Sequence, residues 1–363
     1  MIRPLRLNAG NQWLTTQDLM KGIPSVSLSD QENRVVQLCR DWLTGKQEFE
    51  FQTSGSTGTS KKIRFKRNQL ESSARLTEQA LQLRPGYTAL VCLDVRFIAG
   101  AMMVIRSLVT GMDMIIRDPA ANPLAEISET IDFAALVPYQ LQTVLEQTPS
   151  ALLHVRKVII GGANLPANSI ERLQSFPVDF YATYGMTETI THVALQKLNG
   201  SYRQDYFQLL PGIRASTDDR GCLILHVPHV RSEPIVTNDV VALLEETKFR
   251  WVGRFDRVIN SGGVKVQPEK IEKAAESIFT QLGVEKRFFI VGIPDPKLGE
   301  KVALILEGPK IVREKEQQIL AMLSQCVALY EVPKILLFID HFIETNTQKI
   351  DRLATMKVLT SAH

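Results

Sequence analysis

The chain has 363 residues, 44% of them hydrophobic and 22% charged, and its 42 basic and 39 acidic residues give a net charge of +3. At roughly 100–200 residues per domain, this length predicts about two domains. The small net charge does not support a nucleic-acid partner, which usually requires a clustered basic face. The four cysteines lie far apart and form no CxxC pair, so we expect neither a zinc site nor a disulfide framework.

The N-terminal residues and the apolar stretches bear on localisation. The first ten residues carry charges, but no apolar run follows them. The apolar stretch at 99–109 is interrupted by Arg106 and is too short to cross a bilayer. We therefore expect a cytoplasmic protein with no signal peptide and no integral membrane segment.

From about residue 50, short β-rich runs alternate with helical stretches. The expected strands are 89–93, 113–116, 134–137, 157–160 and 179–183. The expected helices are 68–83, 100–109 and one after Pro138. This alternation favours a layered α/β fold with a mostly parallel sheet.

After Gly200 the pattern changes to short strands separated by turns, which predicts an antiparallel β subdomain. Its expected strands are 213–215, 222–227, 240–244 and 249–252. A third pattern follows, with strands at 256–260, 287–292, 301–307 and 334–338 and helices at 268–279 and 314–326. We therefore expect a large α/β domain over residues 1–255 and a small α+β domain over residues 256–363, with the boundary at Asp256.

Residues 53–61 form the sharpest local motif of the chain. They are Thr53, Ser54, Gly55, Ser56, Thr57, Gly58, Thr59, Ser60 and Lys61. The glycines allow the backbone N–H groups to turn inward, while the hydroxyls and the lysine add donors and charge, so the run can bind phosphate. It is not a Walker A loop, because Ser60 stands where that motif has a glycine. A flexible Ser/Gly linker is the alternative.

This loop resembles the phosphate loop of adenylate-forming enzymes, the family of acyl-CoA synthetases, luciferases and peptide-synthetase adenylation domains. Further segments resemble motifs of that family and occur in the same order. They are residues 161–163, 184–189, 239, 253–256, 260–265, 294–300 and 346–352. The resemblance covers about residues 50 to 352, and it implies a large α/β domain followed by a small, mobile α+β domain.

The resemblance also implies an ATP site, with a role for each matching residue. Residues 53–58 and Lys61 would hold the phosphates, and Gly161, Gly162 and Ala163 would lie beside adenine. The motif Tyr184-Gly185-Met186-Thr187-Glu188 would place an aromatic ring against adenine, a threonine at the α-phosphate and a carboxylate at Mg²⁺, a cation that prefers oxygen ligands. Asp239 and Arg254 would contact the ribose.

The same resemblance implies a domain movement between two half-reactions. A carboxylic acid first attacks ATP to give an acyl-adenylate, and a thiol, most simply that of coenzyme A, then takes the acyl group. Asp256 would be the hinge, Lys349 would reach the site for the first step, and Gly262 and Gly263 would line the coenzyme A tunnel for the second.

The chain also departs from the family pattern. The 52 residues before the phosphate loop are far fewer than the family usually carries, so we expect a truncated large domain. Ser60 replaces the usual proline, and Asn238 stands where glycine is common. Phe97 replaces the histidine of a His-x-x-Gly segment that ends here at Gly100.

The residues around this segment bear on the acid substrate. Phe97 to Met103, Arg106 and the stretch around His192 resemble short o-succinylbenzoate–CoA ligases of menaquinone synthesis. That acid is a dicarboxylate, so its second carboxylate needs a cation, for which Arg106 is the first candidate and Arg96 the second. Alternatively, Arg106 faces solvent on its helix, and His192 is a hydrogen-bonded core residue rather than part of an acyl pocket.

Other functions remain open. The chain could be a ligase for another aryl or fatty acid, an adenylation enzyme that loads a carrier protein, or a catalytically silent nucleotide-binding protein. Its expected partners are the small molecules ATP, the acid and coenzyme A, and a homodimer is the one protein assembly kept open.

Overall fold

The computed structural model describes residues 6–9, 12–21, 27–52, 62–163, 165–345 and 350–361. Two expected parts of the active site, the phosphate loop at 53–61 and Lys349, lie outside these described residues.

A 13-stranded sheet is formed by strands between residues 6 and 254. Its strand order is β12-β13-β14-β15-β11-β10-β9-β8-β7-β5-β6-β1-β2. Its parallel part contains β1 (Arg6–Ala9), β6 (Asp113–Ile116), β5 (Thr88–Val91), β7 (Ile131–Leu136), β8 (Val155–Ile160) and β9 (Asp179–Gly185). The edge strand β2 (Gln12–Thr15) is antiparallel to β1. Every residue of β6 and β7 is buried, as expected for parallel strands covered by helices on both faces.

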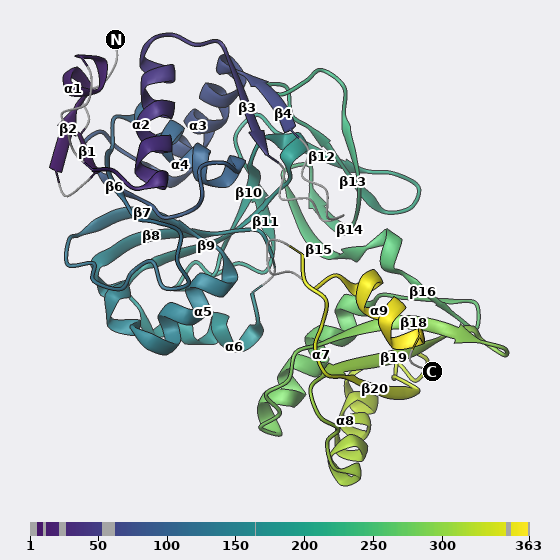
Figure 1. The fold of residues 1–363 in the computed structure, drawn as a ribbon. Helices are drawn as coiled ribbons and strands as arrows, with labels where there is room; N and C mark the ends of the chain where they lie inside the picture. Colours follow the sequence, from purple (N-terminus) through teal and green to yellow (C-terminus); the bar gives the residue numbers. More distant parts are fainter. Residues whose placement is uncertain are drawn as a thin grey trace.

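Helices cover both faces of this sheet (Figure 1). One face carries α2 (Asp30–Leu43), α3 (Arg67–Leu81) and α4 (Ile98–Thr110), and the other carries α5 (Pro138–Gln147) and α6 (Ala167–Arg172). The short α1 (Thr16–Lys21) follows β2, and single turns η1 (Pro149–His154) and η2 (Leu173–Ser175) complete this layer. Helix α4 is buried along its length from Gly100 to Thr110, which places its one charged residue in the interior.

The expected antiparallel strands do not form a sheet of their own but extend the parallel one. The expected strands are β12 (Arg214–Thr217), β13 (Cys222–His226), β14 (Ile235–Glu245) and β15 (Lys248–Arg254), and two strands that were not expected, β10 (His192–Lys197) and β11 (Phe207–Leu209), connect them to β9. The sheet is continuous because β11 pairs with β10 on one side and with β15 on the other. A separate hairpin of β3 (Glu48–Gln52) and β4 (Lys62–Lys66) flanks the expected phosphate loop.

A second, five-stranded sheet contains the C-terminal strands (Figure 1). They are β16 (Ile259–Ser261), β17 (Val264–Val266), β18 (Phe288–Asp295), β19 (Gly299–Glu307) and β20 (Ile335–Ile339), accompanied by α7 (Pro268–Gln281), α8 (Arg313–Cys326) and α9 (Arg352–Ser361). The expected strand at 256–260 was wrong at its start, because Val258 N–H bonds back to the Phe255 carbonyl and closes a turn, η4 (Phe255–Arg257). Strand β17 and helix α9 were not expected.

Helix α7 packs this second sheet against the first. The Ala167 N–H donates to Glu276 Oε2 over 3.4 Å. A Cβ on Gly253 of β15 would lie 2.6 Å from Glu269 Oε2, so the side chains of α7 lie close against this strand.

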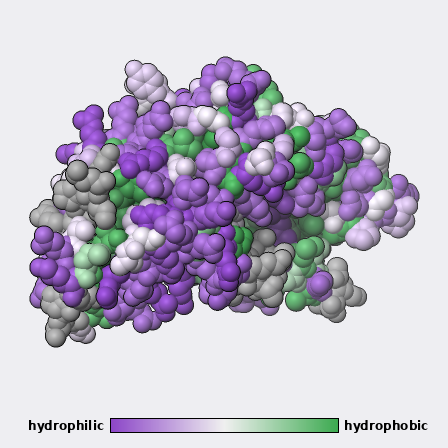
Figure 2. All heavy atoms as spheres, turned by 90° about the horizontal axis from the view of Figure 1, so that it is seen from above, coloured by the Kyte–Doolittle hydropathy of each residue, from purple (hydrophilic) through white to green (hydrophobic). Residues whose placement is uncertain are grey.

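The surface of the described residues is that of an ordinary globular protein. The face seen from above is mostly hydrophilic, with its hydrophobic side chains in small separate groups (Figure 2). Among the described helices, none combines the length and the apolar character needed to cross a membrane.

Candidate active site

The expected adenine and ribose residues meet at the end of β9. The Tyr184 hydroxyl donates to Asp239 Oδ2 over 2.6 Å, and its ring packs edge-on against Phe249, with the centroids 5.1 Å apart. Burial, followed by the charge of Asp239, raises the pKa of Tyr184, so its hydroxyl stays protonated and remains a donor. Tyr184 is therefore fixed at both its ring and its hydroxyl.

Asp239 and Arg254 face each other because they are paired across β14 and β15. The guanidinium of Arg254 lies 3.7 Å from Asp239 Oδ1 and makes a two-nitrogen contact with Asp256, at 3.0 and 2.7 Å. The Trp251 indole N–H donates to Asp239 Oδ1 over 3.1 Å. Trp251 was not predicted as a site residue, because nothing in the strand pattern distinguishes it from a core aromatic.

The expected hinge residue, Asp256, is part of this cluster. Its hydrogen bonds with Arg254 hold the pKa of the Asp256 carboxyl below its usual value. Asp256 lies in η4, between the last strand of the large sheet and the first strand of the second. The contact therefore ties the connection between the two sheets to the ribose side of the candidate site.

Glycines line the ends of β8 and β9. A Cβ on Gly161 would lie 2.5 Å from Thr183 Oγ1, and Gly162 has a φ of +94°, which other residues rarely adopt. Ala163 follows them and is exposed. The backbone at 161–163 is thus open beside the strand that carries Tyr184, as close approach of a flat base would require.

The segment after Gly185 turns sharply back into the sheet. Thr187 and Glu188 lie in the single turn η3 (Thr187–Thr189), which follows Met186, and the side chain of Glu188 is exposed. Among the described residues, no three His, Cys, Asp or Glu side chains gather around one point. A single exposed carboxylate fits Mg²⁺ that takes its other ligands from phosphates and water, so Glu188 is compatible with this cation.

Two expected acid-binding positions lie where α4 begins. Phe97 is the N-cap of α4. A Cβ on Gly100 would lie 2.4 Å from the Asp94 carbonyl oxygen, so only glycine lets this helix start so close to the preceding turn.

Arg106 points into the protein, not into solvent. It is 1% exposed and contacts Thr77, Thr191 and His192. Burial lowers the pKa of Arg106 to about 9. Among the described residues, no carboxylate forms an ion pair with it, although buried charges are normally paired.

Arg96, the second candidate for binding the substrate carboxylate, differs from Arg106 in its exposure and in its ion pairing. Its side chain is 53% exposed and already forms an ion pair with Asp94. It therefore has an internal counter-ion in a solvated position, and Arg106 is the better candidate for binding an anion.

The residues expected to bind the acid and those expected to bind the nucleotide are connected through β9 and β10. We call Tyr184, Asp239, Trp251 and Arg254 the nucleotide cluster. Gly185 at the end of β9 pairs with His192 at the start of β10. Tyr184 of the nucleotide cluster directly precedes Gly185 in the chain. Thr191, which contacts Arg106, directly precedes His192. The structure thus brings these two groups of expected site residues to opposite ends of one short turn.

Gly262 and Gly263 lie in the second sheet, in the two-residue turn between β16 and β17. Their φ angles are +61° and +82°, the combination required by a type I′ hairpin turn. The Gly262 N–H donates to the Leu298 carbonyl over 2.8 Å. The structure does not place this turn in contact with the nucleotide cluster.

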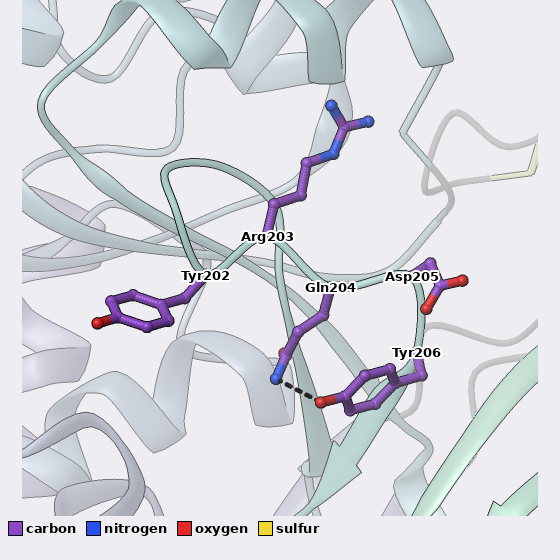
Figure 3. A pocket seen from close by; sticks show the side chains of 5 residues that line it. All are labelled: Tyr202, Arg203, Gln204, Asp205 and Tyr206. Atoms are coloured by element: carbon purple, nitrogen blue, oxygen red, sulfur yellow. Dashed lines mark hydrogen bonds between the residues drawn. The ribbon is translucent and has the colours of Figure 1, made fainter.

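A hollow of about 530 Å³ lies elsewhere, along the loop between β10 and β11 (Figure 3). Within the described part of the chain, residues 202–206 line it, and the side chains of 203–206 already have partners. Arg203 pairs with Glu171, Asp205 pairs with Arg250, and Gln204 donates to the Tyr206 hydroxyl over 3.3 Å. None of the expected site residues lines it, so we do not assign the active site there.

The fold and these motifs define a class of nucleotide-binding enzymes. The family model described as AMP-binding enzyme matches residues 51–216. A solved structure described as an acyl-CoA synthetase (AMP-forming)/AMP-acid ligase II-like protein from Dyadobacter fermentans is 37% identical and covers 93% of this chain and 96% of its own, with a TM-score of 0.63. The chain therefore belongs to the AMP-binding, adenylate-forming enzyme family.

Some members of this family with more specific descriptions are also similar to the chain. Curated 2-succinylbenzoate–CoA ligases of Staphylococcus aureus are 25% identical over 324 residues, which cover 83% of this chain. This chain spans 65% of their length. An o-succinylbenzoate coenzyme A synthetase from Bacillus subtilis, in complex with ATP and magnesium ion, has a TM-score of 0.71 at 17% identity over 85% of this chain and 69% of its own, a likeness of fold alone.

Proposed function

We propose that the protein is an acid–thiol ligase that converts a carboxylic acid to its acyl-adenylate with ATP and then to its coenzyme A thioester. The first candidate for the acid is o-succinylbenzoate, which would place the enzyme in menaquinone biosynthesis in the cytoplasm. The observation that carries this proposal is the linked pair of clusters, in which an aromatic ring and a carboxylate suited to a nucleoside lie one turn away from a buried guanidinium that forms no ion pair with any described carboxylate.

In the proposed first step, the acid carboxylate attacks the α-phosphorus of ATP and pyrophosphate leaves. The carboxylate is ionised at neutral pH, so the step needs no general base. Tyr184 and Asp239 would hold the nucleoside, while Thr187, residues 53–58, Lys61 and Lys349 would stabilise the charge on the phosphates. When bound by Glu188, Mg²⁺ would supply further positive charge to the phosphates.

In the proposed second step, the thiol of coenzyme A attacks the acyl carbonyl carbon, and AMP leaves with the electrons of the broken C–O bond. We place the hinge for the intervening movement at Asp256, between a large domain at 1–255 and a small domain at 256–363. The Gly262-Gly263 turn would replace Lys349 at the site and make room for the pantetheine arm. Lys349 and the Gly262-Gly263 turn both fall within the proposed small domain, so one rotation of that domain could exchange them.

The choice of a dicarboxylate depends on Arg106. A buried guanidinium is costly unless an anion compensates it. Among the described residues no carboxylate does so, and a second carboxylate of the substrate could fill this role through a charge-assisted hydrogen bond. Phe97, Gly100 and His192 would form the surrounding acyl site.

The proposal is tested by isotope exchange between pyrophosphate and ATP with o-succinylbenzoate, benzoate or octanoate, followed by AMP release on adding coenzyme A. We expect o-succinylbenzoate to support the fastest exchange. Arg106→Leu should lower kcat/KM for this acid at least about tenfold, since a hydrogen-bonded ion pair is lost. Arg96→Leu is the matched control and should behave as wild type.

Other results would favour the alternatives. Fastest exchange with octanoate would identify a fatty-acid ligase, and acyl transfer to a carrier protein but not to coenzyme A would identify a loading enzyme. If no acid supports exchange, the protein is a silent nucleotide-binding member of the family.

A further inference from the structure

A closed network of polar side chains surrounds Arg106. Thr77 of α3 and His192 of β10 are 0% and 5% exposed. Arg106 Nε lies 3.3 Å from Thr77 Oγ1, and His192 Nε2 lies 3.1 Å from the same oxygen. Arg106 Nη2 lies 3.4 Å from His192 Nδ1 and donates to Thr191 Oγ1 over 2.9 Å. Three elements distant in sequence therefore converge on one guanidinium.

The donors in this network determine the state of His192. The Thr77 hydroxyl donates its single proton to the Ser73 carbonyl, 3.2 Å away, and Arg106 Nε can only donate to it. His192 Nε2 must therefore also donate to the Thr77 oxygen, and Nδ1 must accept from Arg106 Nη2. His192 is thus neutral, with its proton on Nε2. Burial, and then the charge of Arg106, lower its pKa well below the usual value, in agreement with this assignment.

The network leaves one part of the guanidinium available. Nε and Nη2 have oxygen or nitrogen partners, whereas Nη1 contacts only the sulfur of Met103, at 3.9 Å, within the described part of the chain. All of these partners are neutral. Thr77 and His192 thus fix the plane of Arg106 without neutralising its charge.

We propose that Thr77 is a positioning residue for acid selection: together with neutral His192, it holds Arg106 in the orientation that binds the second carboxylate of a dicarboxylic acid. This inference rests on the proposed function. Thr77 would not contact the substrate, and its contribution would be confined to acids with a second carboxylate.

The first experiment compares Thr77→Val with Thr77→Ser, which keeps the hydroxyl, in pyrophosphate exchange with o-succinylbenzoate and benzoate. We expect Thr77→Val to lower kcat/KM for o-succinylbenzoate about tenfold or more, the usual effect of losing a hydrogen bond to a charged group, and to change the value for benzoate less than about twofold. Thr77→Ser should retain most of the selectivity.

Thr143→Val is the matched control, because Thr143 is also a buried helical threonine but bonds only to the Tyr139 carbonyl of its own helix. It should keep the wild-type ratio between the two acids. An unchanged ratio in Thr77→Val, or an equal loss for both acids, would overturn the proposal.

The second measurement does not require a folded Thr77 variant. In wild-type protein labelled with ¹⁵N-histidine, the His192 signal, assigned by its absence in His192→Gln, should be that of a neutral ring protonated on Nε2 at pH 7. A charged ring, or one protonated on Nδ1, would contradict the network. If the wild type shows no exchange with any acid, the proposed function itself fails. The ¹⁵N signal would still show whether His192 has the protonation that the network around Arg106 requires.

Discussion

Within the nucleotide cluster, Asp239 is the residue toward which the other three side chains are directed. One of its oxygens accepts from the Tyr184 hydroxyl and the other from the Trp251 indole. Arg254 lies near enough to balance its charge, at 3.7 Å. The carboxylate is therefore held in place before any nucleotide binds, which lowers the entropic cost of accepting ribose hydroxyls.

Replacing Asp239 by Asn tests this role. An amide has one acceptor oxygen, so Asn cannot accept from both Tyr184 and Trp251, and one buried donor loses its partner. We expect a loss of about 1–3 kcal/mol in the free energy of unfolding and a KM for ATP raised about tenfold or more, measured by denaturant unfolding and by pyrophosphate exchange. Tyr184→Phe removes a single hydrogen bond and should raise KM less. A wild-type KM for ATP in Asp239→Asn would exclude the ribose role.

Single residues also show how far the sequence could be interpreted. Arg106 was recognisable as one charge within an apolar helix, but only the fold revealed that it lies in the interior. Thr77 had a weaker signal, because it continues the apolar stripe of Leu70, Ala74 and Leu81 on α3. Its partner His192 lies 115 residues away, a proximity that no local pattern predicts.

Among the elements, the turn from β9 through η3 to β10 is the one that joins the two parts of the site. It is tight, because a Cβ on Gly185 would lie 2.3 Å from the Thr191 carbonyl oxygen and 2.5 Å from His192 Cα. Ile190 within the turn has a φ of +69°, which is strained for a β-branched residue. The turn adopts this backbone geometry although the strain at Ile190 costs free energy.

Gly185→Ala tests the importance of this turn. Since the clash is with backbone, we expect a loss of about 1–3 kcal/mol or more in stability together with loss of pyrophosphate exchange, measured by denaturant unfolding and by activity. Gly86→Ala is the comparison for backbone strain without a clash, because Gly86 has a φ of +80° but a Cβ there meets no atom within 4 Å, so it should lose stability without losing exchange. Wild-type stability and exchange in Gly185→Ala would show that close packing at Gly185 is unimportant.

The regular elements of the interior were the most predictable from sequence. The strand expected at 113–116 agrees with β6, and the helix expected at 68–83 agrees within two residues with α3. Their apolar patterns are set by burial between layers. The joining of the antiparallel strands to the large sheet was not predictable, because it depends on the pairing of Phe207 with Phe249, which are distant in sequence and have no distinctive local signal.

At the scale of the whole molecule, we expect the contact between the two sheets to depend on pH. Burial raises the pKa of both Glu269 and Glu276 on α7, which means that their charged forms are disfavoured where they lie. Below their raised pKa the two carboxyl groups are protonated, and the contact is then stronger. The contact weakens as the pH rises through this pKa and the groups lose their protons. At neutral pH the contact is therefore less stable than its packing suggests, as a rotation about Asp256 would require.

The residue that follows Lys349 in the chain packs against the second of these sheets. Ile350, the next residue, forms a bridge with Glu344, and the Asp351 N–H donates to the Ile343 carbonyl over 2.8 Å. The nucleotide cluster belongs to the large sheet. Lys349 can therefore serve the first half-reaction only in an arrangement of the two sheets that brings the segment before Ile350 to the phosphates.

The most direct test of this account measures the two half-reactions separately in Lys349→Ala, using rapid quench for acyl-adenylate formation and coenzyme A addition to supplied acyl-adenylate for thioester formation. We predict that the first rate falls about a hundredfold or more, the usual effect of removing a group that stabilises transition-state charge. The second should stay within about threefold of wild type, because its transition state does not use this lysine. Equal loss of both rates would contradict the alternation of the two sheets at one site.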